Sequence, residues 1–480
     1  MISIQNYING ELLPAKTQKT LPIYNPSNGQ IYAQAPDSNE VDVKIAVDVA
    51  SSAYEVWSKS SIEFRSSILM KISDLIEENL EVLARAESMD NGKPLWLAKS
   101  VDIPRAASNF RYFAHAITQF NSECFENLSN NSINYTLNQP LGVVACISPW
   151  NLPLYLFSWK IAPALAAGNC VVAKPSEVTP MTAFLLSELC IKAGMPPGVL
   201  NIIHGYGPSV GEAMTSHPKV KAISFTGSTR VGSAIAEIAA KSFKKVSLEM
   251  GGKNPNLIFA DCDFDEMLRT TVRSSFANQG QICLCGSRIL VERSIYDKFK
   301  NAFVEKAKSL KVGHPDDPET RVGAIVSQAH FEKIKSYIEI AKTEGGQISC
   351  GGNVVKLEGY EEGWYFQPTI IEGLNQQCRT NQEEIFGPVV TIQPFDSDEE
   401  ALNNANATEY GLSATVWTQN LTRAHRMARD LEAGIVWINT WLNRDLRTPF
   451  GGVKNSGMGR EGGMEALRFF TEPKNICIQL

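Results

Sequence analysis

Five short β-rich runs decide the fold of this chain: LGVVACIS (141–148), NCVVAK (169–174), VLNIIHG (199–205), KAISFTG (221–227) and KKVSLEM (244–250). Stretches with the apolar spacing of helices separate these runs. Short apolar strands that alternate with helices are typical of a parallel sheet that helices cover on both faces. The sequence therefore predicts an α/β fold that contains a doubly wound, Rossmann-type sheet.

Helix boundaries can be predicted at two places. The helix between the second and third runs is expected to have Thr179 as its N-cap, Pro180 at its first position and Gly194 just past its end. Nearer the start of the chain, Asp37 and Ser38 are expected to cap another helix. The expected apolar stripe of that helix contains Ile45, Val49, Ala53 and Val56.

A second α/β pattern follows Gly251. It begins with NPNLIFA (254–260) and ends with ATVWTQ (414–419) and GIVWINT (434–440). We therefore expect a second domain of similar size. Two further stretches look different: the polar segment 121–140 predicts a projecting strand pair, and NICIQL (475–480) predicts a terminal strand that a neighbouring subunit could pair with.

The charge balance argues against a nucleic-acid partner. Lys and Arg number 45 against 51 Asp and Glu, which gives a net charge of −6, and no basic cluster stands out. The first residues do not look like a targeting peptide. They lack a basic start followed by an apolar core, and they are not Arg-rich. The most apolar region, 141–173, is interrupted by Asn151, Lys160 and three prolines, so no membrane span is expected.

Ten cysteines are scattered through mostly apolar segments, as expected for reduced thiols in a cytoplasmic protein. One of them, Cys283 in FANQGQICLCGSR (276–288), follows glycine and small polar residues, which suits an accessible nucleophile. A nucleophilic thiol needs a base, and Glu249 in SLEMGGKNP (247–255) ends a β run before a glycine pair. Considered alone, each residue would more often be structural: a buried cysteine or a solvated glutamate.

Cys285 forms a C-x-C pair with Cys283, which raises the alternatives of a metal site or a redox pair. No second cysteine pair and no H-E-x-x-H pattern completes a coordination set, so we expect no metal. Cys285 is then a packing residue or a partner in oxidative inactivation.

Two glycine-rich turns are candidate phosphate sites. FTGSTRVG (225–232) joins a strand to a helix that Ser228 can cap, and the helix N-terminus can bind a pyrophosphate. The residues that follow exclude a Walker A loop. The second turn contains GPSVG (207–211), which matches the G-x-S-x-G pattern of serine hydrolases, so a hydrolase that uses Ser209 is an alternative. Its base would be one of His217, His314, His330 and His425.

Taken together, seven segments resemble the aldehyde dehydrogenase superfamily from near the start of the chain to its end. The resemblance implies an aldehyde dehydrogenase-like fold with a Rossmann-type cofactor domain, an α/β catalytic domain and a small β oligomerisation arm. The segments are FANQGQIC (276–283), LEMGGKNP (248–255), PWNLP (149–153), KPSE (174–177), FTGSTRVG, EEIFGPV (383–389) and PFGGVKNSGMGRE (449–461).

In such a fold we expect three parts. Residues 1–118 and 141–251 would bind NAD, residues 252–450 would form the catalytic domain, and residues 119–140 and 451–480 would form the oligomerisation arm and the C-terminal tail. A homodimer or a homotetramer is expected.

The resemblance also implies catalytic roles. Cys283 would attack the aldehyde carbon, and the Asn151 side chain with the Cys283 backbone N–H would hold the oxyanion. After hydride transfer, Glu249 would deprotonate the water that hydrolyses the thioester. This glutamate favours an acid product over a coenzyme A thioester.

The cofactor implied by the family is NAD. Lys174 and Glu177 would bind the adenosine ribose, and the carboxylate of Glu177 would repel the 2′-phosphate of NADP. Glu384 would bind the nicotinamide ribose, with Phe386 and Trp150 flanking the cofactor. The expected cofactor site also contains Ser148, Gly207, Gly211, Phe225, Gly227 and Ser228.

Two arginines suggest the kind of aldehyde, because guanidinium groups bind carboxylates in a bidentate manner. By the resemblance, Arg105 lies on the helix that lines the substrate funnel, and Arg444 lies on the loop that anchors the aldehyde. Several segments are most similar to 2-aminomuconic and 2-hydroxymuconic semialdehyde dehydrogenases of aromatic catabolism, so a carboxylate-bearing semialdehyde is the expected substrate. There are three alternatives. The substrate could be a betaine-type or aliphatic aldehyde, either arginine could form only a surface ion pair, or the protein could have lost its catalytic activity.

Overall fold

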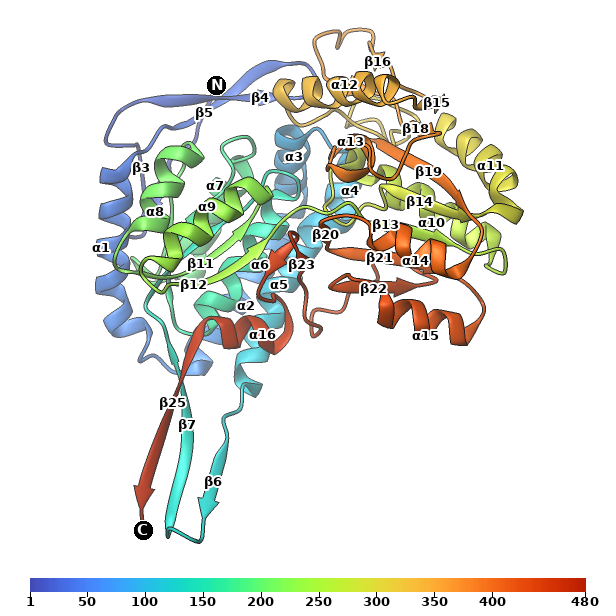
Figure 1. Cartoon of the computed structure of the whole chain (residues 1–480). Coiled ribbons are helices and arrows are strands. Elements are labelled where there is room, and N and C mark those ends of the chain that lie inside the picture. Colours follow the sequence, from blue (N-terminus) through green and yellow to red (C-terminus); the bar gives the residue numbers. More distant parts are fainter.

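The computed structural model describes residues 1–480 as two α/β lobes side by side, with a β arm that projects from the first lobe (Figure 1). The first lobe contains an eight-stranded sheet in the order β24-β12-β11-β8-β9-β10-β2-β3. Its five central strands are parallel and coincide with the five β-rich runs. They are β8 (Val143–Ile147), β9 (Cys170–Lys174), β10 (Leu200–Ile202), β11 (Val220–Thr226) and β12 (Lys245–Glu249).

The strand order reverses at β8. From β8 the chain adds β9 and β10 on one side, and it then returns to add β11 and β12 on the other. Ligands of doubly wound sheets bind beyond the carboxyl ends of the strands at such a reversal. The topology therefore directs attention to the residues that follow β8 and β11.

Antiparallel strands extend this sheet at both edges, and helices cover its faces. The edge strands are β2 (Asn6–Ile8), β3 (Glu11–Leu13) and β24 (Gly457–Met458), and a small sheet of β1 (Ile2–Ser3), β4 (Thr20–Asn25) and β5 (Gln30–Pro36) lies beside the lobe. The helices are α1 (Glu40–Trp57), α2 (Ile62–Glu78), α3 (Leu80–Asn91), α4 (Leu95–Leu97), α5 (Ile103–Ala116), α6 (Pro153–Ala166), α7 (Met181–Ala193), α8 (Glu212–Ser216), α9 (Thr229–Ala240) and α16 (Gly463–Phe469).

The second lobe contains a seven-stranded sheet in which only the edge strand β15 (Gln347–Cys350) is antiparallel. The others, in order, are β18 (Thr369–Glu372), β19 (Val389–Phe395), β14 (Arg288–Glu292), β13 (Pro255–Ile258), β21 (Ser413–Trp417) and β22 (Ile435–Ile438). The expected second α/β pattern is therefore present. Its helices are α10 (Phe264–Phe276), α11 (Tyr296–Lys308), α12 (Gln328–Thr343), α13 (Arg379–Gln382), α14 (Asp398–Asn406) and α15 (Leu421–Asp430), and two short pairs, β16 (Val354–Val355) with β17 (Tyr365–Phe366) and β20 (Tyr410–Gly411) with β23 (Val453–Lys454), complete the lobe.

The arm consists of β6 (Cys124–Asn127), β7 (Ser132–Pro140) and β25 (Thr471–Gln479). The predicted terminal strand exists, but it pairs with β7 of its own chain, from Thr471 opposite Pro140 to Gln479 opposite Ser132. A neighbouring subunit is therefore not needed for this pairing. Residues 451–470, which we expected with the tail, instead add β24 to the first sheet and bury Leu467 and Phe470 in the core of that lobe.

The cap of α1 was predicted at the wrong residue. Asn39 is the N-cap, and the Asp42 carboxylate accepts a hydrogen bond from the Asn39 backbone, which completes a capping box. Ser38 is unsuitable because its hydroxyl accepts a buried hydrogen bond from Asn6. The predicted stripe is also shifted, since Val56 is 76% exposed whereas Trp57 is buried.

The start of α7 differs from the prediction as well. The N-cap is Pro180 rather than Thr179, whose hydroxyl donates to the carbonyl of Trp150. The carboxylate of Asp90 accepts the free N–H of Met181 at 2.7 Å, so a side chain distant in the sequence caps this helix. Gly194 ends α7 in the left-handed conformation, as predicted.

No helix of the chain combines the length and the apolar character that crossing a bilayer would require.

Candidate active site

Two cavities meet at Cys283. The first has a volume of about 240 Å³, and 14 of its 22 lining residues are hydrophobic. The second, of about 230 Å³, is lined mainly by polar residues and glycines, and it includes residues that follow β8 and β11. Thr226, Met250 and Cys283 line both cavities. A thiol at this junction is accessible to two different ligands at once.

The loop before Cys283 has an unusual backbone. Asn278, Gln279 and Gly280 all have positive φ values, of 51°, 57° and 69°. Non-glycine residues rarely adopt this conformation, and it occurs more often at functional sites than elsewhere. At Gly280 a Cβ atom would lie 2.1 Å from the carbonyl oxygen of Gly387, so only glycine fits. The sequence did not reveal this strain, because asparagine and glutamine carry no such signal.

Ionisation of the Cys283 thiol is opposed by its surroundings. Cys283 is partly exposed, yet the surrounding protein atoms desolvate its thiol and raise the pKa of the thiol well above its usual value. The carboxylates of Glu384 and Glu249 raise the pKa further. The thiol is therefore neutral until a base removes its proton.

Glu249 lies in the same cavity as Cys283. It is the last residue of β12, and neither of its carboxylate oxygens has a hydrogen-bond partner. Burial, followed by the charge of Glu461, raises the pKa of the Glu249 carboxyl group. Glu461 itself forms an ion pair of 2.7 Å with buried Lys160. A buried carboxyl group without partners is costly unless a ligand or a proton occupies it.

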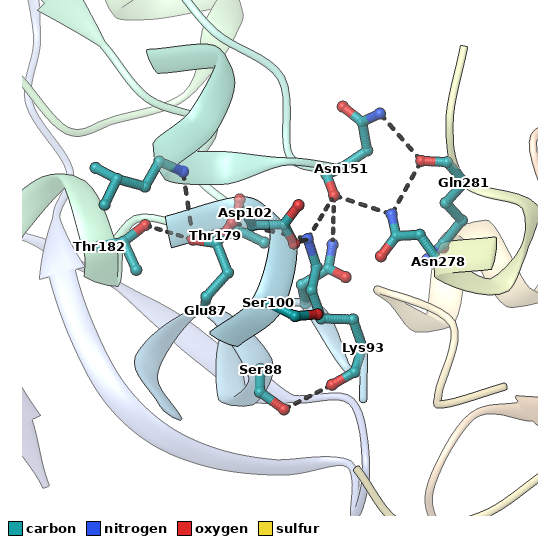
Figure 2. Close-up of polar contacts among 12 residues, drawn as sticks. Glu87, Ser88, Lys93, Ser100, Asp102, Asn151, Thr179, Thr182, Asn278 and Gln281 are labelled. Atoms are coloured by element: carbon teal, nitrogen blue, oxygen red, sulfur yellow. Dashed lines mark hydrogen bonds and ion pairs between the residues drawn. The ribbon is translucent and has the colours of Figure 1, made fainter. Parts of the chain in front are cut away.

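Asn151 lies after β8 and lines the second cavity beside Cys283. One N–H of its side-chain amide donates to the carbonyl of Gln281 at 3.0 Å (Figure 2). The amide group carries two hydrogens, so the other remains free for an oxyanion. The backbone N–H of Cys283 makes no hydrogen bond within the chain.

Five of the residues expected to bind the cofactor line the second cavity together with Asn151 and Cys283: Trp150, Gly227, Ser228, Glu384 and Phe386. The ring centroids of Trp150 and Phe386 lie 5.2 Å apart, edge to face, and His330 packs against Trp150. Glu384 accepts a hydrogen bond of 3.0 Å from the backbone of Gly252.

Gly227 and Ser228 form the expected helix start. The Ser228 hydroxyl accepts a hydrogen bond from Val231 and caps α9. A Cβ atom at Gly227 would lie 2.4 Å from the ring of Phe225, so the packing of this turn requires glycine. A nucleotide pyrophosphate fits such a bare helix N-terminus.

The other expected cofactor residues line neither cavity. Lys174 ends β9 beside β8 and forms an ion pair of 2.9 Å with Glu177. Ser148 follows β8, and its buried hydroxyl has no partner. Gly207 and Gly211 lie in one helical turn. Burial opposes ionisation of Glu177, but the charge and hydrogen bond of Lys174, with a smaller contribution from the backbone of Gly207, lower the pKa of the Glu177 carboxyl group.

Arg105 and Arg444 both line the first cavity with Cys283. The guanidinium of Arg444 packs on Trp159 and Phe450 at 4.2 and 4.1 Å, donates to the hydroxyl of Tyr155, and has a buried Nη2 atom without a partner. Arg105 lies over the Tyr155 ring at 5.5 Å. Neither arginine forms an ion pair within the chain, so the surface ion-pair alternative does not hold.

A third arginine in this cavity was not predicted. Arg273, near the end of α10, lines the cavity, packs over the Trp441 ring at 5.5 Å and donates to the Trp441 carbonyl. Burial is the main cause that lowers the pKa of Arg273, and the charges of Arg269 and Arg105 lower this pKa further. From sequence alone, Arg273 is an ordinary charged residue of an amphipathic helix.

The serine hydrolase alternative lacks a base. The Ser209 hydroxyl donates to the carbonyl of Ser38 at 3.4 Å, and no histidine side chain hydrogen-bonds to it. His330 contacts the carbonyl of Phe386 at 2.6 Å, and His217 accepts from the backbone of Lys219. A Ser–His pair is therefore not formed.

The chain belongs to the aldehyde dehydrogenase family, whose model matches residues 13–476. The 2-aminomuconic semialdehyde dehydrogenase of Bos taurus is 50% identical over 100% of this chain and 99% of its own length. The 2-hydroxymuconic semialdehyde dehydrogenase of Pseudomonas sp. (strain CF600) is 47% identical over 100% of both chains. Among solved structures, an aldehyde dehydrogenase of Bacillus cereus in complex with NAD+ has a TM-score of 0.97 at 40% identity and covers 99% of this chain and 96% of its own. The predicted family and the predicted fold class are confirmed.

Proposed function

We propose that this chain is an NAD-dependent aldehyde dehydrogenase that oxidises a semialdehyde bearing a carboxylate away from its aldehyde end. The observation that carries the proposal is that three arginines without ion-pair partners line the cavity that contains Cys283 and Glu249. Arg105 and Arg444 are half-buried and Arg273 is exposed. Guanidinium groups that line a cavity without ion-pair partners favour an anionic ligand. The names of the two semialdehyde dehydrogenases above agree with this substrate class.

The first half of the reaction forms a thioester. Glu249 accepts the thiol proton of Cys283, and the sulfur attacks the aldehyde carbon. The oxyanion accepts hydrogen bonds from the free N–H of the Asn151 amide and from the Cys283 backbone N–H, and such donors stabilise developing charge strongly in a dry site. Bound NAD supplies the hydride acceptor for the oxidation.

The second half releases the acid. Glu249 passes the thiol proton to solvent and then removes a proton from a water molecule, the resulting hydroxide attacks the thioester carbon, and the sulfur leaves. The raised pKa of Glu249 suits this role, because a carboxylate whose pKa lies closer to neutral pH is a stronger base. The net change is aldehyde, NAD and water to acid, NADH and a proton.

The preference for NAD over NADP is attributed to Glu177. Its carboxylate is held by Lys174 and can accept hydrogen bonds from ribose hydroxyls, whereas a 2′-phosphate would be repelled. The polar second cavity fits the nicotinamide end of the cofactor, with Glu384 at the ribose and Trp150 and Phe386 at its sides.

The test compares two aldehydes of equal length, 5-oxopentanoate and pentanal, by NADH formation. We expect kcat/KM to favour the anionic substrate, and Arg105→Ala and Arg444→Ala each to lower that preference by about 10-fold or more, the loss expected for a charged hydrogen bond. Arg111→Ala is the matched control, since Arg111 is also on α5 but pairs with Glu77 and Asp74. Equal kcat/KM values for both aldehydes in the parent would exclude an anionic substrate and favour an aliphatic aldehyde.

The larger organisation is also proposed. Residues 1–118 and 141–251 would bind NAD and residues 252–450 would provide the nucleophile. The arm, with exposed Phe125, Leu128 and Ile478, supports assembly into a homodimer or a homotetramer. The cytoplasmic location stays a prediction.

A further inference from the structure

One backbone carbonyl beside the reaction centre accepts three side-chain hydrogen bonds. The donors to the Asn151 oxygen are the Lys93 ammonium at 3.2 Å, the Asn91 amide at 3.3 Å and the Asn278 amide at 3.0 Å. Figure 2 shows Lys93 and Asn278 converging on this oxygen from different elements. A carbonyl oxygen has two lone pairs, so three donors exceed the usual complement.

The Lys93 ammonium is held by a fully buried charge cluster. It lies 2.6 Å from the Asp102 carboxylate and 3.7 Å from that of Glu87, and all three side chains are at most 2% exposed. Burying charges is unfavourable unless they are paired in good geometry. The network therefore fixes the position of Lys93 closely.

The cluster connects several parts of the active site. Glu87 accepts hydrogen bonds from the Thr182 hydroxyl at 3.0 Å and from the Leu154 backbone N–H, which belongs to the first turn of α6. Asp102 lines the first cavity and lies one helical turn before Arg105. The segment that bears Asn151 is thus tied to the wall of the substrate cavity.

We propose that Lys93 is a positioning residue: its ammonium group, held by Asp102 and Glu87, fixes the backbone of Asn151 so that the side-chain amide is aimed at the oxyanion. This inference rests on the proposed role of Asn151. Lys93 touches neither substrate nor cofactor, and it acts only through the Asn151 peptide. Its contribution is to prevent the oxyanion donor from moving.

The experiment uses the double variant Lys93→Met/Asp102→Asn, which removes the ammonium together with its nearer carboxylate, so that only Glu87, 3.7 Å from the ammonium, loses a charged partner. We expect kcat to fall about 10- to 100-fold, the loss typical of a small misplacement of a catalytic group, with KM for the aldehyde little changed. The rate at which iodoacetamide alkylates Cys283 and the affinity for NAD should stay at parental values, because neither depends on the oxyanion donor. Asn91→Ala removes one neutral donor to the same carbonyl and should cause a smaller loss of kcat in a variant that folds more easily.

Two reference variants make the result decisive. Lys300→Met breaks a partly buried ion pair with Glu372 in the second lobe and should leave kcat unchanged. Asn151→Ala alone should have a lower kcat than the parent.

Parental kcat in both the double variant and Asn91→Ala, while Asn151→Ala is impaired, would overturn the role of Lys93 and leave the proposed function intact. Equal losses of kcat, alkylation rate and NAD affinity would also overturn it, since they would indicate general damage. Parental kcat in Asn151→Ala would overturn the oxyanion assignment itself.

Discussion

At the residue scale, the chemistry is carried by polar groups that the fold leaves without partners. Both carboxylate oxygens of Glu249, the Nη2 atom of Arg444 and the hydroxyl of Ser148 are buried and unpartnered. Nearly all buried polar groups in proteins are hydrogen-bonded, so the unpartnered atoms of Glu249 and Arg444 at the wall of the first cavity are candidate contacts for a ligand.

Glu249→Gln should impair both halves of the reaction, because Glu249 is the base for the Cys283 thiol and for the hydrolytic water. Glutamine cannot take a proton from either, so turnover should slow by about 100- to 10,000-fold. Stopped-flow measurement should show slow formation of NADH without a burst. Steady turnover at the parental rate would contradict the assignment of Glu249 as the base.

The pH profile provides the control for this prediction. Because burial raises the pKa of Glu249, its basic form should appear only above the ordinary carboxyl value of about 4.3, and kcat should rise with pH through the raised pKa. Glu249→Gln should remove this rise. If the rise of kcat with pH persists in Glu249→Gln, the group that titrates is another residue.

Single residues also show how far sequence reasoning reaches. Cys283 and Glu249 could be predicted because their local contexts, a small polar loop and a strand end before two glycines, are visible in the chain order. Arg273 and Lys93 could not, because their roles arise from contacts with Trp441 and Asn151, which are distant in sequence. Periodicity places such residues on a helix or in a turn but does not reveal what they face.

At the scale of elements, the strands were easier to predict than the helix ends. Each parallel strand is an apolar run long enough to be recognised, whereas the caps depend on competition between neighbouring polar residues. Ser38 is occupied by Asn6, so Asn39 caps α1, and Asp90 caps α7 from another helix. A cap supplied from outside the local segment has no local signal.

The nucleophile loop gives a prediction at this scale. Gly280→Ala should strongly destabilise the protein and lower activity, because a Cβ atom would clash with the Gly387 carbonyl as well as force a left-handed alanine. Gly194→Ala is the matched control: its φ is +80°, but nothing lies within 4 Å, so it should lose only about 1–2 kcal/mol. Urea unfolding and NADH formation test both variants, and a loss at Gly280 no larger than at Gly194 would contradict the tight packing of this loop.

At the scale of the whole molecule, the two lobes contain the two cavities, and the arm projects from the first lobe as the proposed surface for assembly. The arm combines residues 124–140 with the last strand, and β25 is its edge strand. Edge strands with exposed apolar side chains are ready-made pairing surfaces. The existence of the arm could be predicted from the composition, but the pairing of β25 with β7 of the same chain could not.

Ile478→Glu should weaken assembly, because it places a charge on the arm where Ile478 is 47% exposed. Light scattering coupled to size exclusion should then show a smaller species than the parent. Val56→Glu changes a residue that is 76% exposed on α1, outside the arm, and should leave the mass unchanged. The same mass for the parent and Ile478→Glu would place the contact elsewhere.

The two chain ends lie at very different places. The C-terminus is at the tip of the arm, where the Leu480 carbonyl oxygen accepts from Asn131, and the N-terminus lies on the first lobe (Figure 1). In the proposed assembly through the arm, an affinity tag or fluorescent fusion attached after Leu480 would compete with the docking of the second subunit. The same fusion placed before Met1, which is 84% exposed, would leave that contact undisturbed.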